Sequence, residues 1–276
     1  MNPFRIELQL WGVRGSIPTP APENLGFGGN TTCLEVRLPG DEVLVIDGGT
    51  GARKLGLSLL ERARGKSLDL NVLMTHFHWD HIQGIPFFAP LYNAANRITF
   101  HSTKDPEAVR EILEGQMTHP YFPVQFELLA AHRQFNHIAA GPVQLGSATV
   151  RTFPLHHPQG ATGYRVEANG AVIVHACDHE HGEPRFDEAL LAHAMGADIL
   201  IFDAQFTPEE YATKRGWGHS TWLEATRVAK AAGVKRLLLF HHDPSHTDDQ
   251  LRAIAEDASK EFSNVEAARE GAVFTL

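Results

Sequence analysis

The chain has 276 residues, of which 43% are hydrophobic and 21% charged, so its composition is that of a globular protein and not of a disordered or fibrous one. The formal net charge of −9 at pH 7 excludes a broadly basic surface for nucleic acid, and two isolated cysteines exclude a disulfide framework. Because no apolar run approaches ~20 residues and the amino terminus lacks signal-peptide features, we expect a single cytoplasmic domain over residues 1–276, with no membrane segment and no stable nucleic-acid complex.

The first half of the chain is predicted to begin with strands and then to alternate strands with helices. Alternating or apolar runs predict strands at 5–11, 32–38, 43–46 and 68–74, with a Gly/Pro-rich loop over 12–30 and an amphipathic helix over 51–64. From 86 to 141 the pattern is less regular. A helix is predicted over 105–114, and the aromatic, proline-punctuated segment 117–124 is of a kind that can cap a pocket.

The second half repeats this order. Strands are predicted at 148–153, 163–167 and 171–176, the last two joined by Asn169-Gly170, a dipeptide typical of a type I′ hairpin turn. Helices at 184–194, 221–232 and 247–260 then alternate with strands at 198–202 and 236–240. Each half thus runs from a β-rich stretch into an α/β stretch. The simplest architecture for two such halves is an α/β fold of four layers, an αββα sandwich.

The run from Thr75 to His81 contains three imidazoles and a carboxylate directly after an apolar strand. Neutral imidazole and carboxylate are ligands that suit zinc, manganese and iron. Alternation predicts that His76 and His78 face one metal, while Asp80 and His81 face a second one beside it. The spacing therefore predicts two divalent ions, zinc in the first place, with manganese or iron as alternatives.

Four further positions place polar side chains immediately after apolar strands, where ligand sites of layered α/β folds lie. They are Asp47, the pair His156-His157, Asp178 and the pair His241-His242. Strand ends would gather these residues at one edge of the sandwich.

Together these motifs resemble the metallo-β-lactamase superfamily, and in particular its phosphodiesterase branch, which includes ribonuclease Z and cyclic-diester hydrolases. The resemblance implies a metallo-β-lactamase fold in which one metal is held by His76, His78 and His157, the second by Asp80, His81 and His241, and both by Asp178. It implies that Asp47 orients a ligand histidine from outside the shell. His157 is preferred over its neighbour His156 because residues 158–165 resemble the family segment that follows the ligand, and Asp178 is preferred over Glu180. His242, Asp243 and His246 are left as pocket-wall or solvated residues.

The segment Gly218-His219-Ser220-Thr221 resembles the ribonuclease Z motif whose histidine assists catalysis from outside the metal shell. The matching acidic position is Asp203, while the family's own histidine before it is replaced by Phe202. The resemblance thus implies Asp80, His219 and Asp203 as catalytic residues, with a water activated between two ions and His219 available to protonate the departing alkoxide.

One departure from ribonuclease Z concerns the substrate. That enzyme carries a protruding tRNA-gripping arm between the motifs at Tyr164 and Asp178, whereas this chain turns directly through 167–171. We therefore expect a phosphodiesterase for a small or cyclic phosphodiester, such as a cyclic nucleotide, and expect that the protein can form a homodimer. The alternatives are a hydrolase of a thioester, lactone or other acyl substrate, ribonuclease Z-like RNA processing, and a non-catalytic metal-binding module.

Overall fold

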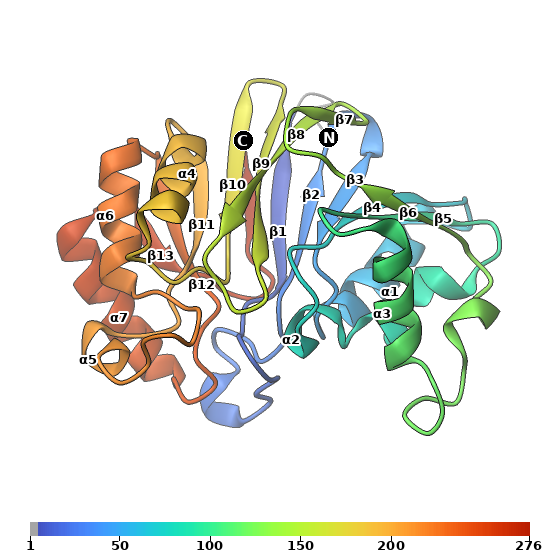
Figure 1. The fold of residues 1–276 in the computed structure, drawn as a ribbon, viewed down its shortest axis with the longest axis horizontal. Helices are drawn as coiled ribbons and strands as arrows, with labels where there is room; N and C mark the ends of the chain where they lie inside the picture. The colour runs from blue at the N-terminus through green and yellow to red at the C-terminus, as the bar shows by residue number, and fades with distance from the viewer. Residues whose placement is uncertain (1–4) are drawn as a thin grey trace.

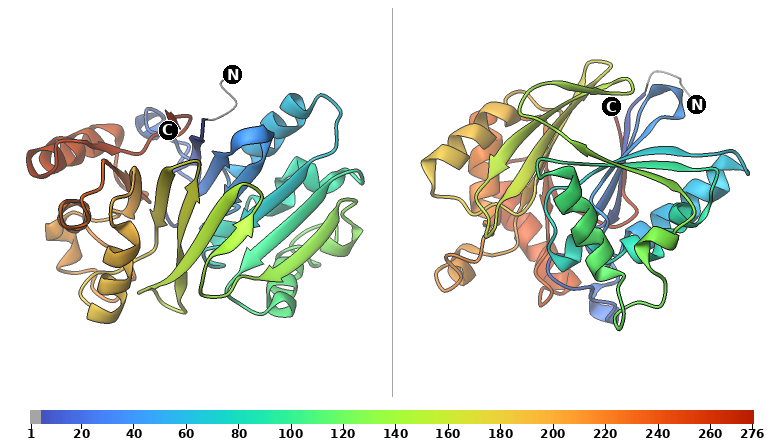
Figure 2. Two further views of the ribbon diagram at one scale, coloured as in Figure 1. Left: turned by 90° about the horizontal axis from the view of Figure 1, so that it is seen from above. Right: turned by 45° about the vertical axis from the view of Figure 1, so that its right-hand side comes forward.

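A computed structural model describes residues 5–276; Met1 to Phe4, which belong to the stretch where no signal peptide is expected, lie outside the described residues. The described chain forms two seven-stranded mixed sheets that face each other, with helices on their outer faces (Figures 1 and 2). The predicted αββα sandwich is confirmed. Among residues 5–276, none of the helices combines the length and apolar character that a membrane crossing requires.

The first sheet is built mainly from the amino-terminal half. Its strand order is β14-β1-β2-β3-β4-β5-β6, with β1 to β3 antiparallel and β3 to β6 parallel. The bounds are β1 (Glu7–Gly12), β2 (Cys33–Arg37), β3 (Val43–Ile46), β4 (Asp69–Leu73), β5 (Arg97–Ser102), β6 (His132–His137) and β14 (Val273–Thr275).

The second sheet repeats this plan with the rest of the chain. Its order is β13-β12-β11-β10-β9-β8-β7, with β7 to β10 antiparallel and β10 to β13 parallel. The bounds are β7 (Val143–Leu145), β8 (Ala148–Leu155), β9 (Ala161–Ala168), β10 (Ala171–Ala176), β11 (Ile199–Asp203), β12 (Arg236–Phe240) and β13 (Val265–Ala267).

Helices cover the outer face of each sheet. Helices α1 (Ala52–Ala63) and α3 (Pro106–Gln116) bury their apolar sides on the first sheet, while α4 (Pro184–Ala194), α6 (Trp222–Ala232) and α7 (Asp248–Glu261) cover the second. The predicted helix starts are built as capping motifs, since Thr221 and Thr247 accept the backbone N–H groups of Glu224 and Gln250. The short helices α2 (Trp79–Ile82) and α5 (Pro208–Tyr211) lie at the lower edge of Figure 1, beside strand ends.

One apolar core lies between each sheet and its helices, and a third fills the space between the two sheets and fixes how they face each other. This third core joins Leu8, Leu34 and Ile46 of the first sheet to Val166 and Ile201 of the second. Because β3 and β4 in one sheet and β10 to β12 in the other are parallel, their carboxyl ends meet along one edge of the sandwich. This packing places the predicted strand-end residues together.

The region 86–141 is more regular than its sequence pattern indicates. It contains β5 and β6 as well as α3, and these strands extend the parallel part of the first sheet. The sequence of β6, His-Arg-Gln-Phe-Asn-His, is polar because β6 is the edge strand and most of its side chains are exposed. The Asn169-Gly170 hairpin is confirmed, since both residues have positive φ, at 45° and 82°.

The two sheets are also joined by a buried hydrogen bond. The hydroxyl of Tyr164 on β9 donates to the carbonyl oxygen of Met74, just after β4, over 2.6 Å, and Tyr164 is fully buried. This bond connects the second sheet to the start of the histidine run.

We predict that Tyr164→Phe lowers the free energy of unfolding by about 1–3 kcal/mol, because it leaves the buried Met74 carbonyl without its donor. Urea denaturation of the metal-free protein measures this change. The matched control is Tyr121→Phe, since Tyr121 is 78% exposed. Equal stabilities of the two variants would contradict the assigned role of the Tyr164 bond.

Candidate metal centre

Three site residues stand directly after strands in an unusual backbone conformation. Asp47, Asp178 and His241 follow β3, β10 and β12, and their φ angles are 60°, 63° and 61°. This left-handed conformation is costly for residues other than glycine, and such strain gathers at functional sites, where the surrounding structure holds it. All three residues are buried, so the fold maintains the strain where these side chains converge.

A first group of three imidazoles comes from both sheets. The ligand-type nitrogens of His76, His78 and His157 lie within 4.8 Å of one another. His78 Nδ1 is 3.1 Å from His157 Nε2. His76 and His157 are buried, while His78 is half-buried, so the group is open to solvent on the His78 side.

A second group lies beside the first and contains Asp80, His81 and His241, whose ligand-type atoms also lie within 4.8 Å of one another. Asp80 Oδ2 is 3.1 Å from His241 Nε2 and 3.5 Å from His81 Nε2. The same oxygen accepts the backbone N–H of Ser16 over 2.7 Å, so the 12–30 loop holds Asp80 in place.

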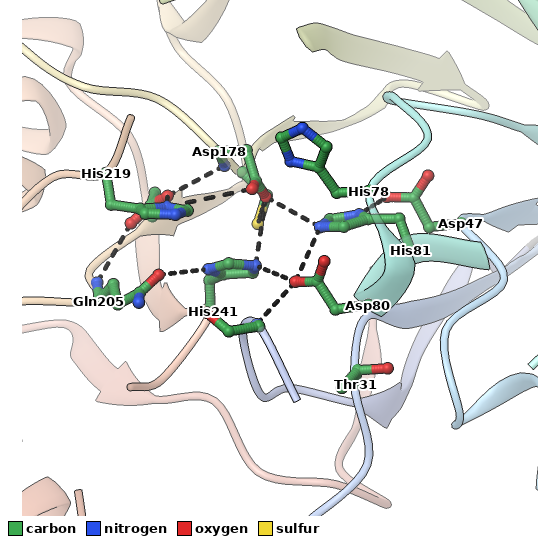
Figure 3. Close-up of polar contacts among 12 residues, drawn as sticks. Thr31, Asp47, His78, Asp80, His81, Asp178, Gln205, His219 and His241 are labelled. Atoms are coloured by element: carbon green, nitrogen blue, oxygen red, sulfur yellow. Dashed lines mark hydrogen bonds and ion pairs between the residues drawn. The ribbon is translucent and has the colours of Figure 1, made fainter. Parts of the chain in front are cut away.

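The carboxylate of Asp178 lies between the two groups. Figure 3 shows it beside His81 and His241 of the second group, with His78 of the first group nearby. Asp178 Oδ2 is 3.6 Å from His76 Nε2 and 3.5 Å from His157 Nε2. Its Oδ1 is 3.1 Å from His81 Nε2 and 3.3 Å from His241 Nε2. Each oxygen therefore faces one group, which is the arrangement of a carboxylate that bridges two ions.

The ring nitrogens on the far side of these histidines are occupied by acceptors. His81 Nδ1 bonds to Asp47 Oδ2 at 2.8 Å, His157 Nδ1 to the Gly218 carbonyl at 2.8 Å, and His241 Nδ1 to Gln205 Oε1 at 3.0 Å. Such partners fix the tautomer and the ring plane of metal-binding imidazoles. The structure thus places Asp47 where the sequence predicts it. It also shows Gln205 and the Gly218 carbonyl as partners of His241 and His157. Neither could be predicted from the sequence, because a glutamine amide and a backbone carbonyl are not recognisable there as parts of a metal site.

His219 and Asp203 meet at the edge of the same site. His219 Nδ1 bonds to Asp203 Oδ2 at 2.7 Å and is 4.0 Å from Asp178 Oδ2. Asp203 is fully buried and accepts four backbone N–H groups, those of Asp178, His179, Gln205 and Ser220. The bond to Asp203 occupies Nδ1 and leaves His219 Nε2 as the free nitrogen.

The electrostatics of the centre favour ionised carboxylates. Burial raises the pKa of Asp178, but His241, His81, His76 and His157 outweigh it and hold that pKa well below its usual range. Burial lowers the pKa of His241, but Asp178, Asp80 and Asp203 raise it to about 9. For His76, burial and the neighbouring imidazole of His81 lower the pKa well below the ordinary value. The carboxylates are thus kept as anions and His76 is kept neutral, which are the forms that bind a cation, whereas His241 carries a proton that a bound cation would displace.

The donor set fits two divalent cations. The Nε2 atoms of His76 and His81 are buried and have no hydrogen-bond partner within residues 5–276, although both rings are held from the other side. Unsatisfied buried nitrogens are costly unless something binds them. Both nitrogens face Asp178, so cations on either side of this carboxylate would satisfy them.

Several neighbouring residues have other roles. Glu180 belongs to none of the groups of ligand-type atoms and accepts the N–H groups of Gly216 and Gly218, while His156 bonds to the Glu180 carbonyl. Of the two alternatives for His242 and His246, pocket-wall or solvated, the second is excluded because both residues are 1% exposed. His242 bonds to the Ala268 carbonyl and His246 to Glu210, so both stabilise loops around the site. In the segment 117–124, the Phe122 ring packs on Phe87, and its function as a lid stays a prediction.

The fold and this cluster of imidazoles and carboxylates define a metallo-β-lactamase fold hydrolase that uses divalent metal ions. The chain belongs to the β-lactamase superfamily, because the model of the "Beta-lactamase superfamily domain" matches residues 43–242. The ribonuclease Z of Thermoplasma acidophilum is 25% identical to it over 305 aligned positions, which cover 93% of this chain and 92% of that protein.

Solved structures share the fold over almost the whole chain. The metallo-β-lactamase fold protein YhfI from Bacillus subtilis has a TM-score of 0.75 at 21% identity, covering 99% of this chain and 100% of that one. A diphosphatase of the PhnP family has a TM-score of 0.72 at 18% identity, covering 99% of this chain and 98% of that one. The predicted family and fold are therefore confirmed.

We predict that Asp47→Asn lowers zinc affinity by about 10- to 100-fold, because the amide keeps the shape but removes the negative charge that orients His81. Competition with a chromophoric chelator measures the affinity without any assay of activity. Asp41→Asn is the matched control, since Asp41 is exposed on the surface. An affinity of the Asp47 variant equal to that of the control would contradict this role.

Proposed function

We propose that the protein is a dinuclear metal-dependent phosphodiesterase that cleaves a small phosphodiester. The observation that carries this proposal is the position of Asp178 between two groups of ligand-type atoms, with the His219–Asp203 pair beside them. A site of this shape can hold two ions side by side, and an independent proton donor stands next to it.

The proposed ligand sets follow the two groups. His76, His78 and His157 would hold one ion, Asp80, His81 and His241 the other, and Asp178 both. Two divalent ions supply a more acidic water and neutralise charge that develops on the phosphoryl oxygens. We propose zinc as the native metal, because nitrogen-rich sets with few carboxylates suit it.

His219 is proposed as the proton donor to the departing oxygen. Its Nδ1 is bonded to the fully buried Asp203, which fixes the tautomer and leaves Nε2 outside that bond. A histidine changes its protonation state near neutral pH, so it can donate a proton when an alkoxide leaves. Asp203 acts as a positioning residue.

The proposed small size of the substrate is supported by a short connection and by charge. The strands β9 and β10 pair directly up to Ala168 and Ala171, so the turn between them contains only Asn169 and Gly170. No arm of the kind expected from ribonuclease Z can be built from two residues. The net charge of −9 also disfavours a long polyanion such as tRNA. The two free, buried cysteines, Cys33 and Cys177, agree with a reducing compartment and support the expected cytoplasmic location.

We predict that the zinc-loaded protein hydrolyses bis(p-nitrophenyl) phosphate and at least one cyclic nucleotide faster than it hydrolyses a thioester, a lactone or a lactam. A parallel assay of these substrates after reconstitution with zinc, manganese or iron measures the preference. Activity on the acyl substrates alone would replace the phosphodiesterase proposal with acyl hydrolysis on the same centre.

A second prediction separates the proton donor from the metal ligands. His219→Ala is expected to lower kcat for a 2′,3′-cyclic nucleotide by about 10²- to 10⁴-fold, because its alkoxide leaving group needs a proton. The loss for bis(p-nitrophenyl) phosphate should be much smaller, since nitrophenolate leaves as an anion. His132→Ala on the exposed edge strand β6 is the matched control. Equal losses on both substrates would show that His219 does not act as the proton donor.

A further inference from the structure

The segment 208–218, between β11 and α6, forms one border of the candidate metal centre, and we call it the lip segment. It is anchored by the carboxylate of Glu180, which is 6% exposed. This carboxylate accepts the Tyr211 hydroxyl at 3.0 Å, the Gly216 N–H at 2.7 Å and the Gly218 N–H at 2.8 Å. Three bonds to one buried anion hold the segment in a defined shape.

The end of the lip segment lies against a ligand histidine. Gly218 has a φ of 88°, and a Cβ at this position would come within 2.3 Å of both His157 Nδ1 and Pro158. Only glycine allows so close an approach. Trp217 is therefore one residue from the contact with His157 and two residues from His219.

Two side chains of the lip segment are left available to a ligand. Trp217 is 57% exposed, and Lys214 Nζ lies 4.0 Å from the centre of its ring. Lys214 has no carboxylate within ion-pair distance among the described residues. Lys54, Lys230, Lys235 and Lys260 are paired with acidic side chains, whereas Lys66 and Lys104 have no ion pair among the described residues either. Lys214 is distinguished by its position over an exposed indole. In a chain of net charge −9, an ammonium that lies over an exposed indole and has no ion-pair partner among the described residues is available to bind an anionic ligand.

The same ammonium is linked to the proposed proton donor through one aromatic ring. Lys214 Nζ is 6.0 Å from the centre of the Phe206 ring, and this ring meets the His219 ring edge-on at 6.0 Å. At the other end of the segment, Trp217 precedes Gly218, whose carbonyl accepts a hydrogen bond from His157 Nδ1 over 2.8 Å. Trp217 and Lys214 are thus each one residue or one ring removed from a histidine of the candidate centre.

We propose that Trp217 and Lys214 make the protein selective for nucleoside phosphodiesters that carry a second phosphate. The base stacks on the exposed indole, and the additional phosphate binds the Lys214 ammonium. Stacking on an aromatic side chain is sequence-tolerant because every base has a π-face. This inference rests on the proposed phosphodiesterase function and specifies the class of substrate.

The test compares substrates with one leaving group and different retained groups: methyl p-nitrophenyl phosphate, thymidine 5′-(p-nitrophenyl phosphate) and its 3′-phosphorylated form. Trp217→Ala is expected to lower the kcat/KM ratio of the thymidine substrate to the methyl substrate by roughly 5- to 150-fold. Trp217→Phe should retain most of the ratio. Lys214→Gln should lower the preference for the 3′-phosphorylated substrate over the unphosphorylated one. Lys260→Gln on α7 is the matched lysine control and should leave all the ratios unchanged.

A binding measurement separates this inference from the proposed function. Binding of thymidine 3′,5′-bisphosphate to the zinc-loaded protein, followed by calorimetry, should weaken in both Trp217→Ala and Lys214→Gln and not in Lys260→Gln. If no p-nitrophenyl diester is cleaved but this binding pattern is found, the phosphodiesterase proposal fails and the lip remains a nucleotide-binding site. If both lip variants bind the bisphosphate as the wild type does, or show unchanged substrate ratios, the lip proposal is overturned.

Discussion

The buried carboxylate of Asp178 is the constraint on which the rest of this site depends. It is 1% exposed, and four imidazole nitrogens from both sheets lie 3.1–3.6 Å from its two oxygens. An uncompensated buried carboxylate would cost several kcal/mol, so its surroundings must supply positive charge. Of the four imidazoles, His81 and His241 are, despite burial, held toward the charged form by the neighbouring carboxylates, while burial holds the pKa values of His76 and His157 below the ordinary value. Cations between the carboxylate and the rings satisfy both.

The packing of the two sheets brings the ligand-type residues together. The ligand-type residues come from chain positions as far apart as Asp80 and His241, yet all lie beyond strands at one edge of the two sheets. The shared apolar core sets how the sheets face each other, and the buried Tyr164–Met74 bond ties the second sheet to the start of the histidine run. The left-handed backbone at Asp47, Asp178 and His241 is the local strain that this packing sustains.

Much of this arrangement could be predicted from the sequence, because ligand chemistry and strand ends are both visible there. The choice of His157 over His156, and of Asp178 over Glu180, came from the family resemblance, and the structure places the preferred residue of each pair in the cluster. Contacts through backbone atoms could not be predicted, such as the Gly218 carbonyl on His157 and the Ser16 N–H on Asp80. The strands β5 and β6 were also missed, because an exposed edge strand such as β6 lacks an apolar pattern. Whether His242 and His246 are buried or solvated could not be predicted, because a histidine in a loop sequence can be either.

We propose that the chain binds two metal ions, one on either side of Asp178. The most direct test of this proposal is an anomalous difference map from crystals of the zinc-reconstituted protein, recorded on both sides of the zinc absorption edge. We expect two peaks per chain, one among His76, His78 and His157 and the other among Asp80, His81 and His241, with one oxygen of Asp178 facing each. A single peak, or peaks that do not contact Asp178, would contradict the dinuclear centre.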